Sequence, residues 1–143
     1  MDIRPLTESY AVSPQIDPDD VDAIRAAGYV TVINNRPDAE NPPERQSAAV
    51  RAAVEAAGMT FVENPLSHGN LTEEIVTRQR DAIAEASGPV FAYCASGNRS
   101  SVLWALAQAG ARPVDELIDL PARFGYQLGG LRPLLEARAA EKG

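Results

Sequence analysis

The chain has few of the residues from which disulfides, metal sites and nucleic-acid surfaces are built. Cys94 is its only cysteine, so an internal disulfide is excluded. His68 is the only histidine, and the carboxylates are not clustered. One cysteine and one histidine do not make a conventional zinc site. Acidic residues outnumber basic ones by 20 to 13, and the net charge of −7 argues against nucleic acid or an anionic membrane as the main partner. We therefore expect no metal and neither of these partners.

Long apolar runs are also missing. No stretch approaches the roughly 18 apolar residues that cross a bilayer, and the first residues lack the apolar segment of a secretory leader. No glycine-rich nucleotide fingerprint follows a predicted strand, so we expect no cofactor. A length of 143 residues with 45% apolar content suits a single domain over residues 1–143. We expect the chain to lie in the cytoplasm, where a reactive thiol stays reduced.

What the chain does contain is an alternation of short apolar strands and helices. After an extended piece at 10–16, strands are predicted at 29–34, 59–62 and 90–93. Helices are predicted at 18–27, 44–57, 71–86, 102–109, 113–120 and 131–140. This alternation predicts an α/β fold, with a mostly parallel central sheet flanked by helices on both faces.

Cys94 stands between the strand at 90–93 and a helix that we expect to start near Ser100. Backbone N–H groups at such a turn point inward, Gly97 permits a left-handed conformation, and the helix N-terminus favours an anion. All of these stabilise a thiolate over a thiol. A lone cysteine is often only a small buried apolar side chain, but the glycine, arginine and serine that follow it here seldom coincide by chance. The turn predicts a nucleophile in an anion-binding cradle.

The residues after the cysteine supply the rest of this cradle. Arg99 has a planar fork that binds two oxygens of a phosphate, sulfate or sulfonate. Ser100 is expected to cap the helix and to donate a hydrogen bond to the thiolate. The backbone of the anion loop is contributed by Ala95, Ser96, Gly97 and Asn98.

Two further loops are expected beside Cys94, because ligands of such sheets bind beyond the carboxyl ends of the strands. The loop after the strand at 29–34 brings Arg36 and Asp38, and the loop after the strand at 59–62 brings His68. His68 or Asp38 is a candidate acid or substrate contact. Arg36 is either a second anion ligand or a brace that pairs with Asp38 or Glu40.

Four segments carry a family likeness. They are VSPQI at 12–16, VINNRPD at 32–38, NPL at 64–66 and YCASGNRS at 93–100. In this order they resemble the beta-lactamase-hydrolase-like phosphatase-like domain, a bacterial family also labelled as sulfurtransferases, and the likeness covers nearly the whole chain. The resemblance implies the α/β fold of dual-specificity and tyrosine phosphatases, a Cys94 nucleophile and an oxyanion cradle from Ala95 to Arg99.

The loop itself departs from tyrosine phosphatases, which have five residues between cysteine and arginine where this chain has four. Its spacing resembles the active loop of single-domain rhodaneses, although the Gly-His-Ile-x-Gly-Ala segment usual in rhodaneses is absent. Three hypotheses follow. Cys94 serves a phosphatase-like hydrolase acting on a phosphate ester, or a sulfurtransferase that carries sulfane sulfur from a donor as a persulfide, or the loop belongs to a non-catalytic anion-binding module.

Overall fold

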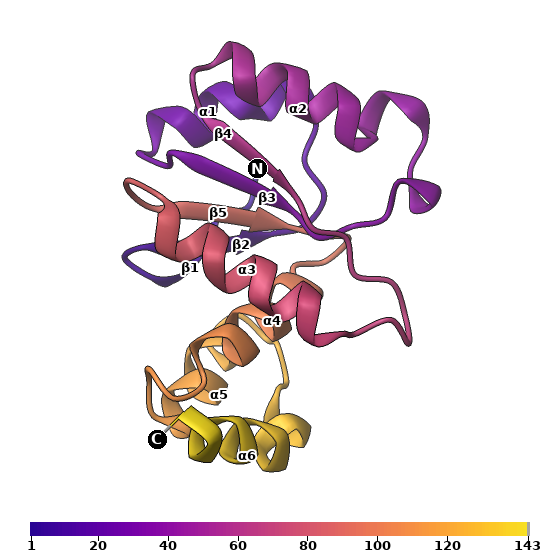
Figure 1. The fold of residues 1–143 in the computed structure, drawn as a ribbon. Helices are drawn as coiled ribbons and strands as arrows, with labels where there is room; N and C mark the ends of the chain where they lie inside the picture. Colours follow the sequence, from indigo (N-terminus) through magenta and orange to yellow (C-terminus); the bar gives the residue numbers. More distant parts are fainter. Residues whose placement is uncertain (143) are drawn as a thin grey trace.

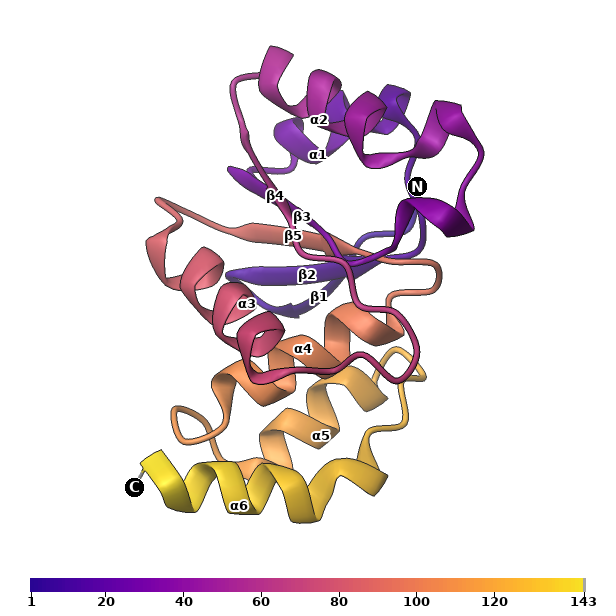
Figure 2. The ribbon, with the colours of Figure 1, turned by 45° about the vertical axis from the view of Figure 1, so that its right-hand side comes forward.

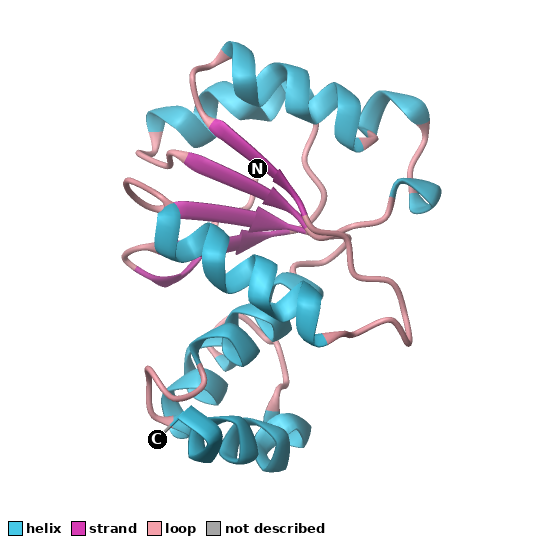
Figure 3. Ribbon diagram, viewed as in Figure 1, coloured by secondary structure: helices cyan, strands magenta, loops and turns pink. Residues whose placement is uncertain are grey.

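A five-stranded sheet lies at the centre of the computed structural model, which describes residues 1–142 (Figures 1 and 3). Its strands are β1 (Arg4–Thr7), β2 (Tyr10–Ser13), β3 (Thr31–Asn34), β4 (Thr60–Glu63) and β5 (Val90–Tyr93). They lie in the order β1-β2-β5-β3-β4. The pairing of β1 with β2 is antiparallel and the other pairings are parallel, so the expected mostly parallel sheet is confirmed.

Helices cover both faces of this sheet (Figure 2). On one face lie α1 (Val21–Ala26) and α2 (Ser47–Ala56), and on the other lie α3 (Glu73–Glu85) and α4 (Asn98–Gln108). Two further helices, α5 (Val114–Ala122) and α6 (Arg132–Lys142), pack against α4 and against each other. Short 3₁₀ turns are η1 (Pro18–Asp20), η2 (Asp38–Glu40), η3 (Pro43–Arg45) and η4 (Gly129–Leu131). Within residues 1–142, none of the helices has the length and apolar content to cross a membrane.

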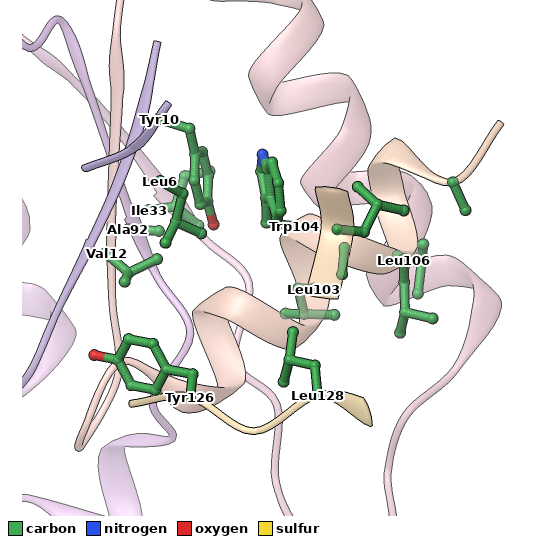
Figure 4. Close-up of a cluster of buried hydrophobic side chains, with 14 of the residues drawn as sticks. Leu6, Tyr10, Val12, Ile33, Ala92, Leu103, Trp104, Leu106, Tyr126 and Leu128 are labelled. Atoms are coloured by element: carbon green, nitrogen blue, oxygen red, sulfur yellow. The ribbon is translucent and has the colours of Figure 1, made fainter. Parts of the chain in front are cut away.

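Alternate side chains of the central strands enter two separate cores. Val32 and Phe91 belong to the buried cluster on the side of α1 and α2, whereas Ile33 belongs to the cluster on the side of α3 and α4. In the second cluster, Tyr10 stacks on Trp104 with ring centroids 6.2 Å apart (Figure 4). Because both faces are covered, every residue of β2, β3 and β5 is buried, and the apolar side chains lie mainly in the middle of the strands. The sheet is thus a rigid base for the loops at its carboxyl edge.

Two elements differ from the sequence expectation. The edge strand β1 (Arg4–Thr7) was not predicted, because it includes Pro5 and buries a single side chain, Leu6, so it shows no alternation. The helix α4 begins at Asn98 with Gly97 as its N-cap residue. The expectation that Ser100 caps this helix is therefore wrong, because Ser100 already lies inside the first turn.

Candidate active site

The turn between β5 and α4 holds Cys94 in a buried position at the carboxyl end of the strand. Gly97 has a φ of 97°, in the left-handed region that favours glycine. Its backbone N–H donates to Cys94 Sγ over 3.0 Å. An N–H donor at a helix N-terminus stabilises a thiolate, so this geometry suits an anionic sulfur.

The exposed residues of the turn form its rim. These are Ala95, Ser96 and Asn98. The Asn98 N–H donates to Ser96 Oγ over 3.2 Å, and the Ala95 carbonyl accepts from the Gln15 N–H over 3.2 Å. The Ala95 carbonyl therefore faces Gln15, and the turn is tied to the segment that follows β2.

Tyr126, which the sequence analysis did not single out, holds the same turn from the side of the C-terminal helices. Its hydroxyl donates to the Ser96 carbonyl over 2.7 Å and accepts from Arg4 Nη1 over 2.6 Å. In Figure 4 the hydroxyl points away from Leu128, which lies on the other side of the ring. Burial raises the pKa of the Tyr126 hydroxyl above its ordinary value, so the group retains the proton that it donates.

The guanidinium of Arg99 lies in the first turn of α4 and is held by an acidic partner. Glu40, in η2, accepts from Nη1 over 2.9 Å and from Nη2 over 2.7 Å, and the Leu66 carbonyl accepts from Nη1 over 2.8 Å. These bonds hold the pKa of Glu40 below its ordinary value, and the bonds to Glu40 keep the pKa of Arg99 above its own. Arg99 is thus a permanent cation whose plane is fixed from the loops after β3 and β4.

Arg36 shares Glu40 with Arg99. Its Nε donates to Glu40 Oε1 over 3.2 Å, its Nη2 to the Glu40 carbonyl over 3.0 Å and its Nη1 to Gln15 Oε1 over 3.2 Å. Arg36 therefore makes the pairing with Glu40 that one of its two expected roles describes. The brace connects the loop after β3 to the cysteine loop through a single carboxylate.

The two candidate acids occupy different positions. Asp38 accepts from the Ser47 N–H over 2.7 Å and from Ser47 Oγ over 3.0 Å, so both carboxylate oxygens anchor the loop to the start of α2. These contacts do not favour the expected role of Asp38 as an acid, because both of its oxygens are engaged with Ser47. His68 is exposed on the loop between β4 and α3, and Leu66 of that loop contacts Arg99.

Ser100 belongs to a buried polar network behind the turn. Its hydroxyl donates to Asn35 Oδ1 over 2.9 Å, so its single proton is directed at Asn35, and the expected bond from Ser100 to the thiolate is not made. Asn35 and Gln79 exchange side-chain hydrogen bonds of 2.9 Å and 3.2 Å, and Gln79 also accepts from Asn64 over 2.9 Å. Tyr10 closes the network by accepting from Gln79 and donating to the Ser100 carbonyl. This network joins β2, α3, α4 and the loops after β3 and β4.

A cysteine at the end of a central parallel strand, followed by a glycine-capped helix with an arginine in its first turn, places the chain in the protein-tyrosine-phosphatase-like fold class. The structure of PTPMT1 in complex with PI(5)P matches with a TM-score of 0.79, covering 98% of this chain and 96% of that one, at 11% sequence identity. This likeness defines the fold.

The family is narrower than the fold. The model of the beta-lactamase hydrolase-like protein, phosphatase-like domain, matches residues 2–111, and the chain belongs to this family, as the sequence resemblance indicated. A beta-lactamase hydrolase-like protein of Xylella fastidiosa is 32% identical over 143 residues, which are 99% of this chain and 33% of that protein. The chain therefore spans about a third of the length of this curated relative. A crystal structure of a candidate phosphatase from Neisseria meningitidis is 34% identical, with a TM-score of 0.82, and the match covers 96% of this chain and 99% of that one.

Proposed function

We propose that the chain is a cysteine-dependent phosphatase-like hydrolase that cleaves a small phosphate monoester through the Cys94 thiolate. The observation that carries the proposal is the hydrogen bond of 3.0 Å from the Gly97 N–H to Cys94 Sγ, at the N-terminus of the helix that carries Arg99. A nucleophile, a backbone donor and a fixed cation then share one turn. This arrangement suits attack on a dianionic group whose charge must be stabilised as it reacts.

The reaction has two displacement steps at phosphorus. Cys94 Sγ attacks phosphorus, and the S–P bond forms as the P–O bond to the leaving group breaks. The N–H groups of the loop and the Arg99 guanidinium stabilise the equatorial oxygens. Water then attacks phosphorus, the S–P bond breaks, and inorganic phosphate and the thiolate are released.

The leaving oxygen needs a proton in the first step, and we assign this proton to His68. The residue lies on the loop that follows β4, whose Leu66 carbonyl already contacts Arg99 at the site. After donating, the neutral imidazole accepts a proton from the attacking water in the second step. Asp38 is less suited, because Ser47 holds both of its oxygens.

The names of the similar structures favour phosphoryl transfer over sulfur transfer. The Neisseria meningitidis protein is described as a phosphatase candidate, and SIW14, with a TM-score of 0.70, as a PP-IP phosphatase. PTPMT1 is described with bound PI(5)P, a phosphorylated small molecule. No comparison supports the sulfurtransferase hypothesis, and the anion-binding module is the remaining alternative to catalysis.

One set of assays tests the proposal. The wild type is expected to hydrolyse p-nitrophenyl phosphate, and Cys94→Ser is expected to lose this activity, because the hydroxyl is a far weaker nucleophile than a thiolate. Arg99→Lys keeps the charge but not the fork and is expected to retain about 1% of the activity. Intact mass after thiosulfate treatment shows whether Cys94 gains one sulfur atom. A persulfide on Cys94 without phosphate release would instead establish sulfur transfer. If neither phosphate release nor a persulfide is observed, the anion-binding module is the hypothesis that remains.

A further inference from the structure

The peptide between Ser96 and Gly97 is hydrogen bonded at both of its ends. Its carbonyl accepts from the Tyr126 hydroxyl over 2.7 Å, and its N–H donates to Cys94 Sγ over 3.0 Å. In a planar trans peptide the carbonyl and the N–H point in nearly opposite directions. A bond that holds the Ser96 carbonyl outward therefore holds the N–H inward, toward the sulfur.

Gly97 alone does not fix this orientation. A glycine adopts positive and negative φ with similar ease, so the peptide before it is free to rotate unless something outside the turn restrains it. Tyr126 lies directly against this glycine, since a Cβ atom built on Gly97 would be 2.1 Å from the Tyr126 hydroxyl oxygen. The restraint thus comes from a side chain in contact with both residues of the peptide.

Arg4 determines the direction in which the Tyr126 hydroxyl donates. Its Nη1 donates to the hydroxyl oxygen over 2.6 Å, and a guanidinium cannot accept a hydrogen bond, so the tyrosine proton remains for the Ser96 carbonyl. A cationic donor also polarises the O–H group and strengthens the bond that it makes. Asp2 in turn accepts from Arg4 Nε over 2.9 Å, which holds the guanidinium in place.

We infer that Tyr126, held by Arg4, is a positioning residue that keeps the Gly97 N–H directed at Cys94. It acts through the Ser96 carbonyl and increases the thiolate fraction at neutral pH. Tyr126 follows α5 and lies outside residues 2–111, the part of the chain that the family model matches. The C-terminal segment therefore takes part in the chemistry of a turn formed much earlier in the chain.

The reactivity of the single cysteine tests this role. The pH dependence of alkylation by iodoacetamide reports the apparent pKa of Cys94 alone, because no other cysteine is present. Tyr126→Phe is expected to move the alkylation profile to higher pH and to slow alkylation at pH 7 several-fold, since one hydrogen bond to the sulfur is lost from part of the population. Tyr93→Phe is the matched control, because the Tyr93 hydroxyl is buried and has no hydrogen-bond partner among residues 1–142. Its alkylation profile is expected to match the wild type.

A second variant keeps the test decisive if Tyr126→Phe does not fold. Arg4 lies on the edge strand β1, and Arg4→Met removes the donor to the Tyr126 hydroxyl. This variant is expected to move the alkylation profile in the same direction as Tyr126→Phe, by a smaller amount. Unchanged alkylation profiles in the folded variants would overturn the inference. The inference rests on the proposed function only for its catalytic consequence, an expected fall of about tenfold in kcat. Alkylation is measured without a substrate, so the two tests are independent. A wild type that hydrolyses no phosphate ester would refute the proposed function, whereas the alkylation profiles alone decide the positioning role of Tyr126.

Discussion

Glu40 accepts hydrogen bonds from both terminal nitrogens of Arg99, at 2.7 Å and 2.9 Å, although 59 residues separate them in the chain. Arg36 binds the same carboxylate. Arg99 uses Nη1 and Nη2 for its hydrogen bonds to Glu40 and to the Leu66 carbonyl. Glu40 therefore holds the guanidinium by its two terminal nitrogens, and neither of these bonds occupies Nε.

Removal of this support is expected to impair catalysis. In Glu40→Ala the guanidinium loses its fixed plane, and kcat/KM for an aryl phosphate is expected to fall about tenfold, because small displacements of a charge-stabilising group are costly. Glu40→Gln keeps one acceptor and is expected to lose about threefold. Steady-state kinetics measure both values. Activity above the wild type in Glu40→Ala would show instead that the carboxylate competes with the substrate.

The same pair predicts a pH-dependent contribution to stability. Hydrogen bonds from Arg99 lower the pKa of folded Glu40, so the unfolded state binds the proton more readily and the contribution is present in full above the ordinary carboxyl pKa. It is lost as the pH falls through the lowered value. The Tm difference between the wild type and Glu40→Gln is therefore expected to be largest near pH 7 and to shrink below about pH 4.

Thermal unfolding at a series of pH values measures this difference. Glu8→Gln is the control, because Glu8 is exposed and forms no ion pair among the described residues. Its Tm difference is expected to stay small throughout. A Tm difference for Glu40→Gln that is the same at pH 7 and pH 3 would contradict the assignment of the contribution to the charged pair.

The parallel strands could be predicted because each is a short segment rich in apolar residues. Both faces of β3 and β5 are covered by helices, so every residue of these strands is buried, and apolar side chains fill β5 and the middle of β3. The start of α4 could not be predicted in the same way. Ser100 is a good N-cap residue by type, but its hydroxyl is buried against Asn35, and the left-handed Gly97 takes the N-cap position.

The residues of the candidate site that are close together in the sequence could be predicted, and those brought to it by packing could not. Cys94, Gly97 and Arg99 lie in one turn, so their spacing alone indicated an anion-binding loop. Glu40 and Tyr126 reach this turn from 59 and 30 residues away, and their contacts depend on how β1, α5 and the loop after β3 pack. Glu40 was considered only as a partner of Arg36, because no local pattern connects it to Arg99.

The assignment of His68 as the acid predicts a dependence on the leaving group. An alkyl leaving oxygen needs a proton in the transition state more than a p-nitrophenolate does, so His68→Asn is expected to lose about 100-fold in kcat for an alkyl phosphate and only a few-fold for p-nitrophenyl phosphate. Asp38→Asn is the comparison variant, expected to lower Tm through its contacts with Ser47 without changing the ratio of the two substrates. Equal losses for both substrates in His68→Asn would refute the assignment.

Two constraints act on any side chain placed at Gly97, namely the left-handed backbone conformation and the close contact with Tyr126. Gly97→Ala places a side chain at a φ of 97°, which costs about 1 to 2 kcal/mol, and also places Cβ 2.1 Å from the Tyr126 hydroxyl oxygen, which must then move. Gly58→Ala isolates the first effect, because Gly58 has a φ of 82° and a Cβ atom there would meet no atom within 4 Å. In urea unfolding we expect Gly58→Ala to lose about 1 kcal/mol and Gly97→Ala at least about 2 kcal/mol. Equal losses in the two variants would mean that Tyr126 yields without cost, and its hydroxyl would then be too loosely held to orient the Ser96–Gly97 peptide.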